Sequence, residues 1–494
     1  MSIHSRIILT AALLAIHLIP VQGSPAGLSV EKNASGPGVL AYNGKAVFAF
    51  GPMNELMPWA VKLGSKAFDV TSWARWQKAN GMNYVRGYPE SGYGWCPVDA
   101  DGRLFPFKTV STDPLKFDLE QFNPEYWDNF REVTRLLAEH DIIVHLQLYQ
   151  QCYFEDSYEN RWNFNFWNPA NNLNSFVRGL GPNRDGHHPF IESAVEGNDR
   201  LLAHQLKYLE KVLESVGELG NVLLDLSNEM GDGGLDPASA RKWIDITLQA
   251  VENWEHRSGN DILVGMDYTH LPGELARYVL DHPEMELIIT HGDPVWPEGF
   301  VLHRIYGKPV VVVNSRDKSP ESYMTYGRQG DDVRLRRFHW RSLACGVQGV
   351  GDYSKLWEIS PEGFDRTGSF ARHLREFIGG INDYAALHSL LYTHKIHKKV
   401  FSGPGVNHYI LESPDEALIY IEGETHLEGR EFKSAPLTVS NSQMRAGPAE
   451  ALIFHPASGK SETQEVTVKG GQITGLVLPS FVDDIAVRIY RQGR

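Results

Sequence analysis

The sequence is most informative at residues 221–229, which read Asn221-Val222-Leu223-Leu224-Asp225-Leu226-Ser227-Asn228-Glu229. An amphipathic helical pattern over residues 199–216 precedes this run. A short apolar run with turn residues at its ends is typical of a buried parallel strand. We therefore predict a helix that leads into a buried strand, whose last polar residues emerge at one edge of a sheet.

The same alternation of strands and helices extends from about residue 36 to residue 390. Further helical patterns cover residues 73–79 and 126–140. Seven more strand-like runs occur at residues 46–50, 82–86, 142–148, 262–266, 286–290, 309–313 and 347–350. Eight βα units predict an α/β protein with a (β/α)8 TIM barrel. A doubly wound open sheet is the alternative, but no glycine-rich phosphate loop follows the first strand.

The pattern changes after residue 390, where short strands separated by turns replace the helices. The strand-like runs are residues 408–411, 417–421, 451–454, 466–468 and 485–489. Such spacing is typical of an antiparallel β-sandwich. We predict that residues 24–390 form the barrel and that residues 391–494 form a small β-sandwich domain, which serves as a packing partner for the barrel.

The N-terminal residues predict export. Arg6 is followed by an apolar run over residues 7–20 and by small residues that end near Ser24. This order is typical of a secretory signal peptide, here residues 1–23. The run is too short to anchor the chain in a bilayer, and no later run is long enough. We therefore expect a periplasmic or extracellular protein without a membrane anchor.

Charge and composition exclude several classes of partner. The 494 residues carry a net charge of −14, which argues against nucleic acid and against an anionic membrane surface. A neutral carbohydrate tolerates an acidic protein, and 12 Trp and 20 Tyr residues offer flat faces for sugar rings. The three cysteines fit no metal-site spacing, so we expect neither a metal nor another cofactor.

Asn228 and Glu229 leave the fourth strand at the expected barrel mouth, where catalytic groups lie. Cleavage of a glycosidic bond needs an acid that protonates the leaving oxygen, and a Glu carboxyl suits this task. Asn228 could then hold a sugar hydroxyl. The alternative is an Asn that caps a helix, followed by a Glu in its first turn. The eight-strand context favours Glu229 as the general acid.

The Asn228-Glu229 strand end resembles that of a clan of (β/α)8 glycoside hydrolases. The resemblance extends to Arg86, which ends the second strand where this clan has an arginine that supports the catalytic carboxylate. His291 ends the sixth strand, where the clan often has a His or Tyr. The resemblance implies that Arg86, Asn228 and His291 line the substrate site. A lone His at a strand end is otherwise as often structural as catalytic.

A narrower resemblance is to a bacterial apiosidase-like barrel family with a C-terminal sandwich of collagen-binding type. Residues 435–437, 454–459 and 478–481 carry it in the C-terminal part. Around the eighth strand it rests on Arg337, Trp340, Ala344, Gly346, Gly349, Gly351 and Tyr353. It implies a hydrolase of plant or algal polysaccharides or of oligosaccharides derived from them. It does not establish collagen binding.

The seventh strand of this chain departs from the pattern of the glycoside hydrolase clan. The clan places its nucleophilic Glu six residues after the Lys of a Lys-Pro strand, and here that position is Asn314. An amide is not a carboxylate nucleophile. Asp317, a few residues further on, is our first candidate for the second catalytic carboxylate, and Asp293 is the second. Asp317 could instead pair with a neighbouring cation on the surface. Glu321 and Asp352 are further possibilities.

Asn314 also supports a different class of function. A barrel that has lost its nucleophile but keeps its aromatic side chains could bind carbohydrate without cleaving it, with Asn314 among the binding residues. The presence of Glu229 and Arg86 argues against this alternative, since a binding protein needs neither an acid nor its supporting arginine.

The segment between the third strand and the next long helix, residues 152–196, is long, aromatic and rich in Asn. Long loops inside a domain are usually functional, and this one follows a strand at the face where substrates bind. We predict a substrate-binding lid that carries Trp162, Phe164, Phe166 and Trp167.

Overall fold

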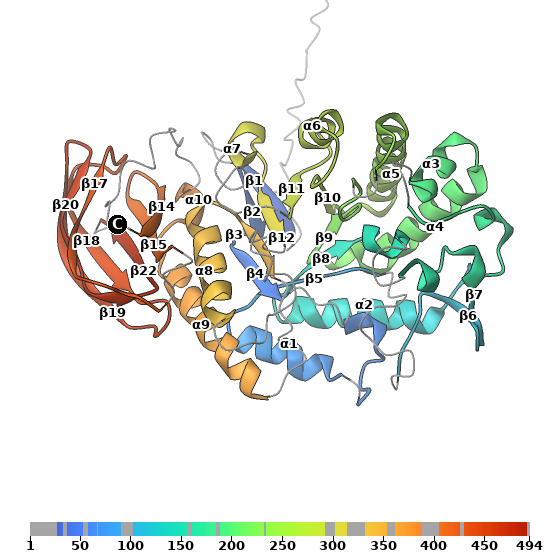
Figure 1. Cartoon of the computed structure of the whole chain (residues 1–494), viewed down its shortest axis with the longest axis horizontal. Helices are drawn as coiled ribbons and strands as arrows, with labels where there is room; N and C mark the ends of the chain where they lie inside the picture. The colour runs from blue at the N-terminus through green and yellow to red at the C-terminus, as the bar shows by residue number, and fades with distance from the viewer. Residues whose placement is uncertain are drawn as a thin grey trace, which may run out of the picture.

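The chain forms an eight-stranded parallel barrel followed by an antiparallel β domain, with helices α8 and α9 between the two (Figure 1). The structure is a computed structural model. It describes residues 27–32, 37–52, 58–66, 68–89, 102–155, 161–183, 188–231, 234–291, 302–313, 331–352, 361–387, 405–424 and 429–491.

All eight predicted barrel strands are confirmed. In the order in which they neighbour one another, they are β4 (Ala49–Pro52), β13 (Gly349–Asp352), β12 (Val310–Val313), β11 (Leu287–Thr290), β10 (Leu263–Asp267), β9 (Val222–Asp225), β8 (Ile143–Gln147) and β5 (Tyr84–Gly87). The pairs along this order are parallel. The first strand begins three residues later than predicted, because Lys45–Ala46 forms a separate short strand, β3.

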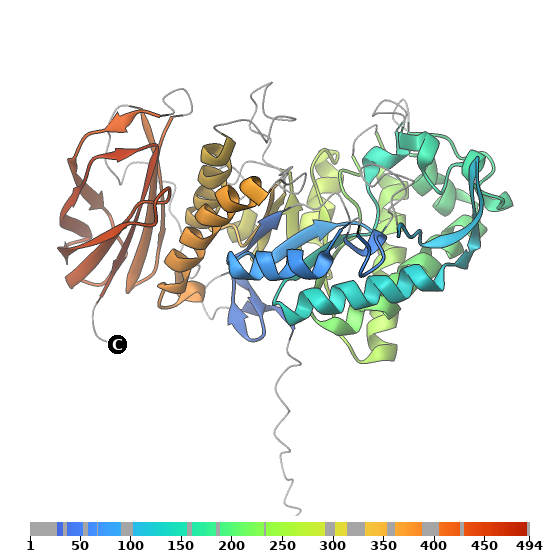
Figure 2. The ribbon, with the colours of Figure 1, turned by 90° about the horizontal axis from the view of Figure 1, so that it is seen from below.

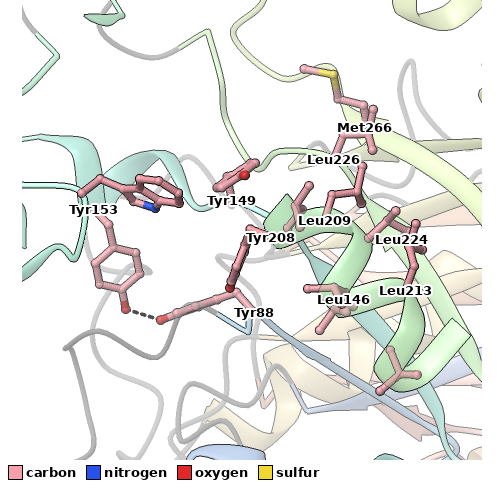
Figure 3. Packing of buried hydrophobic residues seen from close by; sticks show 14 of the residues in the cluster. Tyr88, Leu146, Tyr149, Tyr153, Tyr208, Leu209, Leu213, Leu224, Leu226 and Met266 are labelled. Atoms are coloured by element: carbon pink, nitrogen blue, oxygen red, sulfur yellow. Dashed lines mark hydrogen bonds between the residues drawn. The ribbon is translucent and has the colours of Figure 1, made fainter. Parts of the chain in front are cut away.

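Helices surround the sheet as the alternation predicted (Figure 1, Figure 2). The predicted helix at residues 199–216 has these same bounds in α4 (Asp199–Val216). The others are α1 (Val70–Ala79), α2 (Pro124–Glu139), α3 (Pro189–Glu196), α5 (Pro237–Ser258), α6 (Gly273–Asp281), α7 (His303–Tyr306), α8 (Asp331–Ala344), α9 (Pro361–Gly379) and α10 (Tyr384–Leu387). Figure 3 shows Leu146 and Leu224, on the outer face of the strands, against Leu209 and Leu213 of α4.

The barrel interior is apolar toward the amino-terminal ends of the strands. A hairpin of β1 (Leu28–Lys32) and β2 (Gly38–Tyr42), not predicted from the sequence, closes this end. Its backbone is hydrogen-bonded to Gly220 and Gly307, which precede β9 and β12. Leu40 joins the interior cluster that includes Leu223. The carboxyl ends of the strands therefore form the mouth of the barrel, as in other TIM barrels.

The barrel closes where β4 meets β5, and the backbones of these two strands lie unusually close together. The Asn83 backbone N–H donates to the Phe50 carbonyl at 3.1 Å, and the Phe50 N–H donates to Asn83 Oδ1 at 3.0 Å. A Cβ on Gly51 would lie 2.0 Å from the Tyr84 carbonyl oxygen. Only glycine fits at this position, because the atom in contact belongs to the backbone.

A second hairpin, β6 (Phe107–Thr112) with β7 (Leu115–Phe122), lies at the end of the molecule farthest from the C-terminal domain (Figure 1, Figure 2). The long segment after β8 packs beside it. This segment contains the short 3-10 helices η2 (Gln151–Phe154), η3 (Arg161–Phe164), η4 (Pro169–Asn171) and η5 (Ser175–Val177).

The C-terminal domain has the predicted β-sandwich-like architecture. Its seven-stranded antiparallel sheet has the order β14 (Val406–Glu412), β15 (Glu416–Gly423), β22 (Asp484–Tyr490), β18 (Gly447–Phe454), β19 (Ser461–Lys469), β20 (Gln472–Leu478) and β17 (Ala435–Ser440). The short strands β16 (Glu431–Phe432) and β21 (Phe481–Val482) pair separately. The predicted boundary at residue 390 falls between α10 and β14, outside the described residues, and stays a prediction.

Helix α8 joins the two domains through buried contacts. Trp340 stacks on Tyr420 and on Phe454. The Arg336 guanidinium donates two hydrogen bonds to the Asp484 carboxyl, at 2.8 and 3.1 Å. These contacts remove both apolar and charged surface from water. The C-terminal domain is therefore packed against the barrel, as the sequence predicted.

The closure at Gly51 gives a test of the fold. We expect Gly51→Ala to lower the free energy of unfolding by about 3 kcal/mol or more, because the added methyl group would overlap a backbone oxygen. Gly273→Ala is the matched control, since nothing lies within 4 Å of a Cβ there, and its change should stay below about 1 kcal/mol. Urea denaturation measures both, and equal effects would contradict the closure described here.

Candidate active site

Glu229 lies four residues beyond the end of β9, and its backbone is in the left-handed region with a φ of +51°. A non-glycine residue in this region costs about 1–2 kcal/mol. The Glu229 backbone N–H donates to Asp267 Oδ2 at 3.0 Å, which holds the turn in place. The side chain is 17% exposed, so its carboxyl is within reach of a ligand.

Asn228 is fully buried, and its neighbours fix the orientation of its amide. Its Oδ1 accepts a hydrogen bond from the Arg86 guanidinium and lies 2.6 Å from His291 Nε2. Its Nδ2 donates to Gln150 Oε1 and lies 3.4 Å from Glu229 Oε2. Donors therefore face the amide oxygen and acceptors face the amide nitrogen. The structure thus brings Arg86, Asn228, Glu229 and His291 together, four residues that the sequence singled out.

His291 lies directly beside the Glu229 carboxyl. Its Nδ1 is 3.3 Å from Glu229 Oε1, and its Nε2 is 3.4 Å from Asp267 Oδ2. Nε2 faces two oxygens, of Asn228 and Asp267, and one donor, the Arg86 guanidinium at 3.3 Å; because the Asn228 oxygen is nearest, we assign the hydrogen of a neutral ring to Nε2. In that tautomer Nδ1, the ring nitrogen 3.3 Å from Glu229 Oε1, carries the lone pair.

A second layer of buried polar groups lies beneath these residues. His145 Nε2 is 3.3 Å from Asp225 Oδ2, and its Nδ1 is 2.5 Å from the Tyr84 hydroxyl. Arg86 lies 3.9 Å from the same Asp225 oxygen. Burial lowers the pKa of His145 to about 4, and burial raises the pKa of the Tyr84 hydroxyl. The imidazole is therefore neutral near pH 7, with Nε2–H directed at Asp225 and Tyr84 donating to Nδ1.

Asp267 ends β10 and is completely buried. Burial raises its pKa well above the usual range, and the nearby carboxyls of Asp225 and Glu229 raise it further. Its Oδ1 accepts from the Thr269 backbone N–H at 2.9 Å. Asp267 thus interacts with both Asp225 and Glu229, and neither Asp225 nor Asp267 is exposed.

Our sequence reasoning missed Asp225, Asp267, His145 and Gln147. Each lies at or near the carboxyl end of a predicted strand, and this position is the signal that could have found them. Gln147 ends β8 and faces the barrel interior, because Ile143 on the same strand faces it and side chains alternate. Its amide is fully buried, and neither polar atom has a hydrogen-bond partner. An unsatisfied buried amide costs about 1–3 kcal/mol.

Trp162 and Trp167, which we predicted in a substrate-binding lid, are both buried in the structure. Trp167 is 0% exposed and packs against Phe190 and Tyr208, while Trp162 is 5% exposed and packs against Phe154. No face of either indole is open to a ligand. Phe166 is buried as well, and of the four predicted lid aromatics only Phe164 is exposed.

The segment was predicted to be a lid partly because it is rich in Asn, but three of these asparagines stabilise the segment itself. The side-chain amides of Asn165, Asn168 and Asn172 donate to carbonyls of the segment itself. The aromatic residues thus form the core of this segment, and its asparagines satisfy its irregular backbone. Three other predicted site residues, Asp293, Asn314 and Asp317, lie outside the described residues.

The described part of the chain contains no group of three His, Cys, Asp or Glu residues arranged to hold a metal ion. In the same part, no helix combines the length and the apolar character that crossing a membrane requires.

The fold is shared with solved glycoside hydrolases. One structure described as a glycoside hydrolase aligns with a TM-score of 0.54 at 12% identity, over 95% of this chain and 98% of that one. A glycoside hydrolase family 5 protein from Bacteroides vulgatus ATCC 8482 aligns with a TM-score of 0.57 at 13% identity, over 95% of this chain and 94% of that one. No protein-family model and no curated protein sequence matches this chain. At such identity the likeness shows the fold alone.

The buried imidazole of His145 gives a test of the site. Its folded pKa of about 4 lies below the ordinary 6.5, so the unfolded chain binds the proton more tightly and stability falls as the pH drops through this window. Between pH 7 and pH 5, wild type should lose about 2 kcal/mol more unfolding free energy than His145→Gln. Denaturant titrations at both pH values measure the difference.

His256→Gln, on the exposed side of α5, is the control and should keep the wild-type pH dependence. If His145→Gln also keeps it, His145 is not held neutral in the folded protein.

Proposed function

We propose that the chain is a glycoside hydrolase that cleaves O-glycosidic bonds with Glu229 as its general acid. The observation that carries this proposal is the position of Glu229 at the end of the fourth barrel strand. There its carboxyl is partly exposed, while Asn228, His291 and Asp267 hold it from behind. The shared fold with glycoside hydrolases supports the same class of reaction.

With the hydrogen of a neutral His291 on Nε2, the ring places a lone pair and no positive charge within 3.3 Å of Glu229 Oε1, which is compatible with a protonated acid. In the reaction the O–H bond of this acid breaks, the proton passes to the glycosidic oxygen, and the bond from that oxygen to the anomeric carbon breaks. Glu229 is left as a carboxylate, whose Oε2 lies 3.4 Å from the amide nitrogen of Asn228.

The reaction also needs a second carboxylate, which attacks the anomeric carbon or activates a water molecule. Asp225 and Asp267 are fully buried, so neither suits this role. We propose Asp317, with Asp293 as the second candidate, on the sequence argument alone.

The proposed substrate is a plant or algal polysaccharide or an oligosaccharide derived from one. The apiosidase-like resemblance suggests it, and the negative net charge is compatible with a neutral glycan. The resemblance to the clan assigns Arg86, Asn228 and His291 to the substrate site, and in the structure Asn228 and His291 adjoin the partly exposed carboxyl of Glu229. The collagen-binding type of the C-terminal domain remains part of that resemblance.

Glu229→Gln tests the proposed function. We expect at least about a 100-fold loss of kcat on whichever plant or algal glycan the wild type cleaves, measured as release of reducing ends, because an amide donates no proton to the leaving oxygen. Binding of the same glycan by calorimetry should be retained. Asp317→Asn and Asp293→Asn in the same assay identify the second carboxylate.

Glu214→Gln, on the exposed side of α4, is the matched control and should keep full activity. Full activity in Glu229→Gln would refute the assignment. A wild type that binds glycans but cleaves none across the panel would favour the silent carbohydrate-binding barrel instead.

We also propose that the protein is exported, on the signal-peptide pattern of residues 1–23. When the full chain is produced in a bacterium with a secretory pathway, we expect a mature protein that starts at Ser24, outside the cytoplasm. Intact-mass measurement of the purified protein gives the start directly. A version without residues 1–23 should stay in the cytoplasm, and a full-length cytoplasmic product that retains Met1 would contradict export.

A further inference from the structure

The side chain of Gln150 lies one amide group away from the proposed acid, Glu229. Gln150 follows the end of β8 by three residues, and its backbone pairs in parallel with Asn228. The Asn228 N–H donates to the Tyr149 carbonyl at 2.9 Å, and the Gln151 N–H donates to the Asn228 carbonyl at 3.2 Å. The carboxyl ends of the third and fourth barrel strands are therefore joined at this level, which fixes Gln150 beside the residue that precedes Glu229.

The orientation of the Gln150 amide follows from the Arg86 guanidinium. A guanidinium only donates, so the Asn228 atom that faces Arg86 is the amide oxygen, and the amide nitrogen is turned the other way. That nitrogen donates to Gln150 Oε1. The oxygen of Gln150 is thus engaged by Asn228, and the two hydrogens on Gln150 Nε2 are not used in this contact.

The amide of Asn228 uses all four of its hydrogen-bonding positions inside the protein. Its Oδ1 accepts from Arg86 and lies 2.6 Å from His291 Nε2, to which we assign the ring hydrogen. Its Nδ2 donates to Gln150 Oε1 and, at 3.4 Å, to Glu229 Oε2. An amide oxygen has two lone pairs and an amide nitrogen has two hydrogens, so none is left over. Asn228 therefore links Gln150 and Glu229 through one nitrogen atom.

The two side chains that this nitrogen links are the more exposed members of the network. Asn228 is 0% exposed, whereas Gln150 is 7% exposed and the side chain of Glu229 is 17% exposed. Gln150 directly precedes η2, yet its side chain does not cap that helix. Among the residues that the structure describes, none accepts a hydrogen bond from Gln150 Nε2. Next to the proposed acid there is thus a donor whose orientation is fixed and whose hydrogens have no acceptor in the protein.

We propose that Gln150 binds the substrate, with Nε2 donating a hydrogen bond to an oxygen of the sugar beside the bond that Glu229 protonates. This inference rests on the proposed function, because it places that sugar next to Glu229. Since Asn228 engages its oxygen, Gln150 offers donors alone. It therefore favours a hydroxyl, ether or carboxylate oxygen and disfavours an ammonium group, which only donates. The expected substrate is a neutral or acidic sugar and not a cationic amino sugar.

Gln150→Glu and Gln150→Met together test this role. Both remove the donor, but Glu keeps a strong acceptor for Asn228 while the sulfur of Met accepts only weakly. On the glycan that the wild type cleaves, KM should rise about three- to tenfold in both variants, as expected for the loss of one neutral hydrogen bond. At the pH optimum of each variant, kcat should stay within about threefold of wild type, because a contact shared by substrate and transition state acts on binding.

A purely structural role would give a different pattern. If Gln150 only orients Asn228 and Glu229, kcat should fall while KM is unchanged, and Gln150→Glu should be much less affected than Gln150→Met. Either of these results would overturn the inference. Thermal melting shows whether each variant is folded. Gln249→Met is the matched control, since the Gln249 amide donates to an exposed carboxyl on α5, and it should keep the wild-type KM.

A binding readout separates this inference from the proposed function. Calorimetry in the Glu229→Gln background, with oligosaccharides from xylan, mannan, pectin and laminarin as probes, should show Kd rising about three- to tenfold when either Gln150 substitution is added. Nitrogen-15 NMR of glutamine-labelled protein follows the Gln150 amide directly, since its signal is absent from either variant, and the signal should shift when the glycan binds.

An unshifted Gln150 signal on a bound glycan, or an unchanged Kd in a folded variant, overturns the inference. Binding without cleavage, with the signal shifted, would refute the proposed function and support this inference. A wild type that binds none of the probes would refute both.

Discussion

The buried guanidinium of Arg86 is the charge around which the barrel mouth is organised. A buried cation costs several kcal/mol unless acceptors and an opposite charge surround it. Here the acceptor is the Asn228 oxygen and the opposite charge is Asp225. Asn228 is thereby turned so that its nitrogen side faces Glu229. The orientation of the proposed acid thus depends on an arginine with which it shares no strand.

Three features of the barrel mouth lower the free energy of unfolding. The left-handed backbone of Glu229, the unpaired amide of Gln147 and the crowded carboxyls each cost free energy. Apolar burial elsewhere offsets these costs. It comes from the barrel strands, from the hairpin that closes the amino-terminal end of the barrel, and from the packed C-terminal domain. A stable scaffold with a strained site at the carboxyl ends of its strands is typical of TIM barrels.

The apolar runs at residues 221–227 and 309–313 were sufficient to predict their strands, because burial on both faces leaves a strong pattern. Arg86, Asn228, Glu229 and His291 were also predictable, since each ends or follows such a run. Asp267 and His145 also lie in or directly after such runs, but the sequence does not say which side chains of the converging strands meet them across the barrel. The burial of Trp167 was not predictable, because composition cannot separate an aromatic that packs against its own domain from one that faces a ligand.

The central claim is that Glu229 delivers a proton to the leaving oxygen. Its most direct test is the dependence of kcat/KM on the acidity of the leaving group, compared between wild type and Glu229→Ala on a series of aryl glycosides. A leaving group that departs as a stable anion needs no proton. The variant should therefore approach wild-type rates on the most acidic phenols and fall far behind on the least acidic ones. A loss of the same size across the whole series would contradict the role of Glu229 as the acid.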